Sequence, residues 1–306
     1  MAAPEKSPLG QGISDAARAV LNGVQVMRDR GGAQVRFWFL ALLVGIAAGF
    51  AAIAFRYGIE KLQAWAYGSE DVARLHSDAA HLDWWWLLVI PIIGGLVVGV
   101  VLRRTTNDGR VHSVADVIEG AALYDGQLKV RRGVGSAIAS FVTLSTGGST
   151  GREGPVVHLA ALISTLVNRW VKADGVTARD LMGCAVAAAV SASFNAPIAG
   201  ALFALEVVLR HFAVHAFAPI VIASVAGTVI SRLTYGDVTE FTLPDQSALA
   251  FYVELPAYMI LGLLSGLVAV VMMRSIFWAD SVASHYQEKI GLPAMLRPAV
   301  AGAMLG

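Results

Sequence analysis

Two uncharged hydrophobic segments constrain this chain more than any other feature of its sequence. Phe37–Phe55 and Trp84–Leu102 each run for 19 residues without a charged side chain. A helix needs about 20 apolar residues to cross the hydrocarbon of a bilayer. A single segment near an N-terminus can be a cleaved signal peptide, but a second one well inside the chain cannot. The sequence therefore predicts a multi-pass membrane protein.

The composition agrees with this prediction and argues against several other classes of protein. The chain has 306 residues, of which 56% are hydrophobic and 15% charged, whereas soluble domains are about 45–50% apolar and about 25% charged. Its formal net charge of +1 gives no reason to expect nucleic acid as a partner. The lone cysteine, Cys184, excludes an intrachain disulfide and is interpreted as a small buried residue. The seven histidines show no ligand-like spacing such as HExxH, so we expect neither a metal site nor a cofactor.

Basic residues indicate how the chain is oriented in the membrane. Arg28 and Arg30 precede the first hydrophobic segment, and Arg103 and Arg104 follow the second. Cytoplasmic flanks of membrane helices are enriched in Lys and Arg. We therefore expect residues 1–34 to form a cytoplasmic N-terminal segment, and the protein to lie in the cell membrane, inner or plasma.

After residue 111 the apolar stretches become short and are interrupted by glycine clusters and charges. Helices are expected near residues 113–123, 131–146, 154–170, 177–193, 198–211, 217–233 and 255–286. Most of the middle ones are too short to span a bilayer. Broken helices at membrane depth are tolerated where they are buried in protein or line a polar cavity, and in transporters they point at the substrate site. The expected fold is an all-α integral membrane bundle of short, tilted and broken helices.

The segment Thr146–Ala160, TGGSTGREGPVVHLA, is the clearest candidate for a functional site. Its glycines allow the backbone to bring several N–H groups together, and a helix is expected to start near Pro155. The N-terminus of a helix is a ready anion site. Glu153 stands where an anion would bind, and its carboxylate can act as a tethered substitute that leaves when protonated. The alternative is that Glu153 only caps its helix. No GxxxxGK[ST] phosphate-binding loop is present.

Two motifs together resemble a known family. GREGP, with its glutamate at Glu153, is followed by Ser193–Gly200, SFNAPIAG. Both motifs and their spacing resemble the CLC family of chloride channels and proton-coupled chloride exchangers. The resemblance runs from about residue 36 to the end and covers the first of that family's two inverted repeats. It implies a first repeat at 35–240 and an incomplete start of the second at 241–306.

The resemblance implies roles for particular residues around GREGP. Glu153 corresponds to the family's extracellular gate. Counting back from Glu119-Gly120-Ala121 places the family's anion-contacting serine at Ser113, although the family's neighbouring glycines and proline are missing here. A helix-capping serine is the alternative for Ser113. The expected anion-binding residues are Ser113, Gly151, Arg152 and Gly154.

A second departure from the family concerns protons. The inner glutamate that relays protons in the family's exchangers falls on Val207, which cannot titrate. Glu206 is adjacent, but one residue turns it by about 100° around an α-helix. Valine at this position favours a passive channel, while some exchangers in the family also lack the glutamate.

The sequence therefore predicts transport of chloride or similar small anions through a passive channel gated by a glutamate. A proton-coupled exchanger with the same anion site and a non-conducting membrane scaffold remain as alternatives. An enzyme is not expected, because no nucleophile–base pair or metal set is present. Besides the anion and the bilayer, the resemblance implies a homodimer whose contact uses the helices between Ile198 and Leu233.

Overall fold

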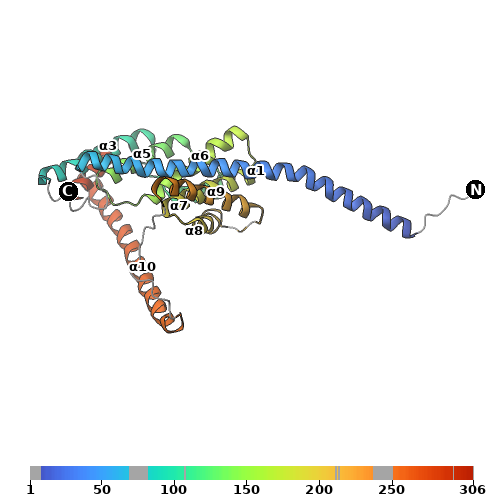
Figure 1. The fold of residues 1–306 in the computed structure, drawn as a ribbon. Coiled ribbons are helices and arrows are strands. Elements are labelled where there is room, and N and C mark those ends of the chain that lie inside the picture. Colours follow the sequence, from blue (N-terminus) through green and yellow to red (C-terminus); the bar gives the residue numbers. More distant parts are fainter. Residues whose placement is uncertain are drawn as a thin grey trace, which may run out of the picture. The chain divides into compact units, whose positions relative to one another are not determined.

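A computed structural model describes residues 8–68, 82–106, 108–210, 212, 214–236, 251–291 and 293–305. Within these ranges it describes the side chains from residue 34 onward, except those of residues 214, 251 and 253. Within these ranges the chain forms helices and no strand, so the predicted all-α fold is confirmed. The helices are α1 (Pro8–Tyr67), α3 (Trp84–Thr105), α4 (Val114–Leu123), α5 (Val130–Ser145), α6 (Glu153–Val171), α7 (Gly175–Phe194), α8 (Pro197–Phe203), η2 (Ala204–Leu209), α9 (Val214–Tyr235), α10 (Phe251–Ile290), η3 (Ala294–Leu296) and α11 (Arg297–Leu305) (Figure 1).

The chain forms two compact units. Unit 1 comprises Met1–Ile53, Val114–Leu128 and Leu159–Gly236, and unit 2 comprises Ala54–Ser113, Lys129–His158 and Asp237–Gly306. Both α1 and α6 contribute one part to each unit. The domain boundaries expected at residues 34 and 240 come from the family resemblance, not from these compact units. They remain a prediction.

Among the residues that the structure describes, four helical stretches are long and apolar enough to cross a membrane. They are Gln34–Tyr67, Trp84–Thr105, His215–Tyr235 and Glu254–Ile290. This confirms the predicted multi-pass character. The most hydrophobic 18-residue window of the last stretch has no buried residue, so the apolar side chains of this part of α10 are exposed.

One expected helix boundary agrees closely with the structure and another was wrong. Helix α6 begins at Glu153, within two residues of the predicted start near Pro155. Proline is tolerated there because N–H groups of the first turn have no intrahelical partner. The helix expected at 198–211 is instead α8 followed by a π-helical turn, η2, and it stops because Arg210 adopts a left-handed conformation, with φ of 57°.

In unit 1, helix α7 forms the buried centre and packs against α8 and α9 (Figure 1). Its N-terminus is capped by Asp174, which accepts a hydrogen bond from the backbone N–H of Thr177 at 2.9 Å. Small residues allow the neighbouring backbones to touch. A Cβ on Gly45 of α1 would lie 2.7 Å from Cα of Ala223 on α9. Such contacts are typical of helices that associate in lipid.

In unit 2, helix α3 packs against α5 and α11. A Cβ at Gly95 of α3 would overlap the carbonyl of Pro298, and one at Gly302 of α11 would overlap that of Pro91. The start of α3 is tied to the end of α1, because the indole N–H of Trp86 donates to the carbonyl of Ala66 at 3.0 Å. Unit 2 therefore also depends on backbone-to-backbone contact.

The packing of α9 predicts an asymmetric response to two similar substitutions. A Cβ on Gly227 would overlap the carbonyl of Ala188 on α7, whereas Gly266 in α10 has no atom within 4 Å of its Cβ position. Gly227→Ala should destabilise the protein by about 1–3 kcal/mol, the usual cost of overpacking. Gly266→Ala should leave stability unchanged or raise it, because alanine favours the helix.

The measurement is the temperature at which each purified variant loses its monodisperse size-exclusion peak. Equal midpoints for Gly227→Ala and Gly266→Ala would contradict the close contact of α7 and α9.

Candidate functional site

The loop before α6 presents backbone donors at one point. Gly151 takes a left-handed conformation, with φ of 73°, which turns the chain into the helix. The N–H of Val156 donates to the carbonyl of Arg152 at 3.2 Å, and Pro155 has no N–H. The N–H groups of Glu153 and Gly154 therefore precede the first intrahelical hydrogen bond, at the positive end of the α6 dipole. This arrangement suits an anion.

The side chain of Glu153 turns back toward this loop. One of its carboxylate oxygens lies 3.8 Å from Nε of Arg152. The other is close to Gly151, since a Cβ there would be 3.1 Å from it. The side chain is 42% exposed, so solvent reaches the carboxylate. Glu153 thus carries a solvent-accessible carboxylate at the start of its own helix.

Ser113 lies against this helix start. A Cβ built on Gly154 would be 3.6 Å from the Cβ of Ser113, which is an ordinary van der Waals distance. Gly154 therefore leaves its backbone open toward the serine. Ser113 immediately precedes α4, so two chain segments about 40 residues apart in sequence meet at the start of α6.

A histidine pair fixes this contact. The rings of His112 and His158 stack with their centroids 5.9 Å apart and their planes 27° apart. His158 lies one helical turn after Gly154, on the same face of α6, and is 3% exposed. Successive residues, His112 and Ser113, therefore contact successive turns of α6, which aligns the serine with the helix N-terminus.

His112 makes two further contacts. Its backbone N–H donates to Oγ of Ser136 on α5 at 3.0 Å, and its Nε2 lies 3.8 Å from a carboxylate oxygen of Asp108. Sequence reasoning missed the pairing of His112 with His158. No periodicity connects two positions that far apart in the chain, so no local pattern could have shown it.

The candidate proton-relay position lies in unit 1, on the π-helical turn η2. Val207 is half-buried and Glu206 is exposed. The expected rotation of about 100° between them assumed an α-helix, whereas the structure has a π-helical turn here, which is wider and has i→i+5 hydrogen bonds. The π-helical turn contacts both α4 and α7. Such turns are frequent at functional sites.

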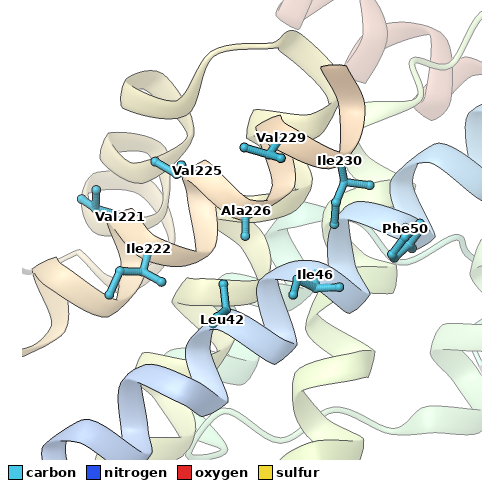
Figure 2. A pocket seen from close by; sticks show the side chains of 9 residues that line it. All are labelled: Leu42, Ile46, Phe50, Val221, Ile222, Val225, Ala226, Val229 and Ile230. Carbon is cyan, nitrogen blue, oxygen red and sulfur yellow. The ribbon is translucent and has the colours of Figure 1, made fainter. Parts of the chain in front are cut away.

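A groove of about 640 Å³ lies between α1 and α9 in unit 1. Figure 2 shows that hydrocarbon side chains line it: Leu42, Ile46, Phe50, Val221, Ile222, Val225, Ala226, Val229 and Ile230. It offers no hydrogen-bond donor and does not suit a small anion. Within the described residues, His, Cys, Asp and Glu do not gather in groups of three that could hold a metal ion.

Comparison with known proteins gives a consistent result. Residues 94–306 match the family model of voltage-gated chloride channels. A ClcB-like chloride channel protein of Ralstonia nicotianae is 31% identical over 271 residues, which cover 87% of this chain and 62% of the relative. Chloride channel protein CLC-f of Arabidopsis thaliana is 28% identical over 295 residues, covering 91% of this chain and 36% of that protein.

Solved structures agree in fold. The crystal structure of a slow cyanobacterial Cl⁻/H⁺ antiporter aligns with a TM-score of 0.72 and 20% identity, covering 88% of this chain and 62% of the other. The chain thus spans less than two thirds of the length of these relatives.

The contact between Ser113 and Gly154 can be tested by cross-linking. The separation of 3.6 Å falls in the Cβ···Cβ range of disulfides, about 3.5–4.5 Å. In a Cys184→Ala background, Ser113→Cys combined with Gly154→Cys should form a disulfide under mild oxidation. The measurement is the loss of both free thiols in a maleimide mass-tag assay.

Each single cysteine variant serves as the control and should keep its thiol. Retention of both thiols in the folded double variant would contradict the contact.

Proposed function

Since the chain belongs to the voltage-gated chloride channel family, we propose that it carries an anion-binding site on a membrane pathway for chloride or similar small anions. The observation that carries the proposal is the contact of Ser113 with Gly154 at the first turn of α6. This contact brings a residue with a hydroxyl to a helix N-terminus, and in the proposal the two together replace part of the hydration shell of an anion. The pathway would lie in the cell membrane.

Each residue of the site has a distinct task in this proposal. The backbone N–H groups of Glu153 and Gly154 and the hydroxyl of Ser113 donate to the anion. Gly151 supplies the left-handed turn that aims the helix at the site. The guanidinium of Arg152 adds positive potential beside the carboxylate of Glu153.

Glu153 acts as the gate in this proposal. Its deprotonated carboxylate competes with the anion for the same donors and closes the pathway. Protonation removes the charge, and a high anion concentration displaces the carboxylate by mass action. The exposure of the side chain and its closeness to Gly151 and Arg152 support this role.

Passive conduction is the mode we favour. Valine at position 207 cannot carry a proton, and Glu206, although exposed, is not an automatic replacement. The alternative is coupled exchange of chloride and protons, for which Glu206 on the same π-helical turn is the candidate relay. A scaffold without flux is the third possibility.

We also propose assembly as a homodimer. Helices α8 and α9 expose large apolar side chains, with Ile198 77% and Leu233 81% accessible. This surface lies within the part of the chain for which the family resemblance implies a subunit contact.

Neutralising Glu153 should change the response to pH rather than flux itself. Wild-type chloride efflux from liposomes should rise as pH falls, since protonation opens the gate. Glu153→Gln cannot carry the charge, so its efflux should stay high and lose most of this pH dependence. Glu119→Gln, which removes an exposed carboxylate on α4, is the matched control and should respond as wild type does.

A normal pH response in Glu153→Gln, or loss of the folded protein, would show that the glutamate is a structural cap. Absence of chloride flux in wild type and both variants would favour the scaffold.

The mode of transport predicts a second outcome. An imposed chloride gradient should not drive uphill proton movement, because Val207 blocks the relay. The measurement is the pH inside liposomes during chloride flux. Stoichiometric proton uptake that disappears in Glu206→Gln would instead identify an exchanger with Glu206 as its relay.

A further inference from the structure

Five basic residues gather at one end of unit 2. Two lie in the last turn of α3 and three at the start of α5: Arg103, Arg104, Lys129, Arg131 and Arg132. We refer to them as the α3–α5 basic surface. Four of the side chains are exposed, and that of Arg132 is half-buried. The proposed anion pathway uses none of them.

Helix packing brings the two groups together. A Cβ on Gly135 of α5 would overlap the side chain of Thr105, so the start of α5 lies directly on the end of α3. A guanidinium N–H of Arg131 donates to the carbonyl of Arg104 at 3.0 Å. Residues separated by about 25 positions in the chain therefore form one continuous surface.

Few carboxylates accompany these basic residues in the two chain segments that carry them. The described residues of 103–113 and 129–136 contain one carboxylate, that of Asp108, and it already accepts a hydrogen bond from Arg110 at 3.0 Å. No acidic residue stands in the first turn of α5. Cations at a helix N-terminus oppose the dipole of that helix, so helix stability does not explain their position. The five side chains leave a local charge of about +5.

The surface also stands at the height of lipid headgroups. Helix α3 has 22 residues, which at about 1.5 Å per residue gives roughly 33 Å. This length matches the hydrocarbon thickness of about 30 Å. Trp84, Trp85 and Trp86 mark the opposite end of the helix, as interfacial aromatic residues do. Arg103 and Arg104 therefore emerge where lipid phosphates lie.

We propose that the α3–α5 basic surface binds the phosphate headgroup of an anionic phospholipid. Arginine pairs with phosphate through two parallel hydrogen bonds, and long basic side chains at helix ends extend to the headgroups. Basic clusters between membrane helices are recognised sites for such headgroups. Basic residues that only orient a protein in the membrane can lie anywhere in its cytoplasmic loops. Orientation therefore does not explain why five of them are packed together on two helix ends. The inference is independent of anion transport.

The test uses the whole purified chain reconstituted in phosphatidylcholine vesicles with traces of spin-labelled lipid. Electron spin resonance gives the association of labelled phosphatidylglycerol relative to labelled phosphatidylcholine. Wild type should prefer phosphatidylglycerol, and about 0.5 M salt should weaken this preference by screening. The triple variant Arg104→Gln, Arg131→Gln, Arg132→Gln should lose about threefold or more of it.

The matched control removes the same charge from three separate exposed sites: Arg36→Gln, Arg274→Gln and Lys289→Gln. It should retain the wild-type preference. An equal loss of the phosphatidylglycerol preference in the two triple variants would show unspecific attraction and overturn the proposal. An unchanged preference in the variant of the α3–α5 basic surface would also overturn it. Should the first variant not fold, wild type and Arg131→Gln alone decide the question. Equal association of labelled phosphatidylglycerol and phosphatidylcholine with wild type would overturn the proposal. An unchanged phosphatidylglycerol preference in Arg131→Gln would also overturn it.

Discussion

Contact between helix backbones is the interaction on which this structure depends. Lipid tails are as apolar as leucine, so helices in a membrane gain little from burying hydrocarbon and associate through close packing. In unit 1 the glycines at positions 45 and 227 bring α9 against α1 and α7, and in unit 2 those at 95 and 302 bring α3 against α11. Each glycine meets backbone atoms, which cannot move aside as the end of a long side chain can. Glycines in such backbone contacts should therefore tolerate substitution poorly, even when the new residue is hydrophobic.

The candidate site is also built from close contacts. Ser113 lies within van der Waals distance of the Cβ position of Gly154, and His112 stacks on His158 one turn further along α6. Two successive residues before α4 therefore lie against the first two turns of α6. The serine lacks the flanking glycines of the family, so under the proposed function its side-chain hydroxyl, rather than a closely approaching backbone, would be the donor to the anion. The α3–α5 basic surface is built by another close contact, between Gly135 and Thr105.

The sequence predicted the parts of this structure that depend on local patterns. The uncharged segments gave the spanning helices, and the glycines of GREGP placed the start of α6 within two residues. It could not predict the π-helical turn at Ala204–Leu209, because hydrophobic periodicity does not distinguish it from α-helix over so short a stretch. Nor could it pair His112 with His158, since that contact joins two segments about 45 residues apart in the sequence. The position of Ser113 came from family resemblance, and its neighbours alone would have suggested a helix cap.

The central claim is that Ser113 and the start of α6 hold one anion. Anomalous diffraction from crystals of the Glu153→Gln variant grown in bromide tests this most directly, because bromide replaces chloride and scatters anomalously. The account predicts a bromide peak within hydrogen-bonding distance of Oγ of Ser113 and the backbone N–H of Gly154, and a weaker peak there in wild type. Bromide bound elsewhere, with none between these two groups in the variant, would contradict it.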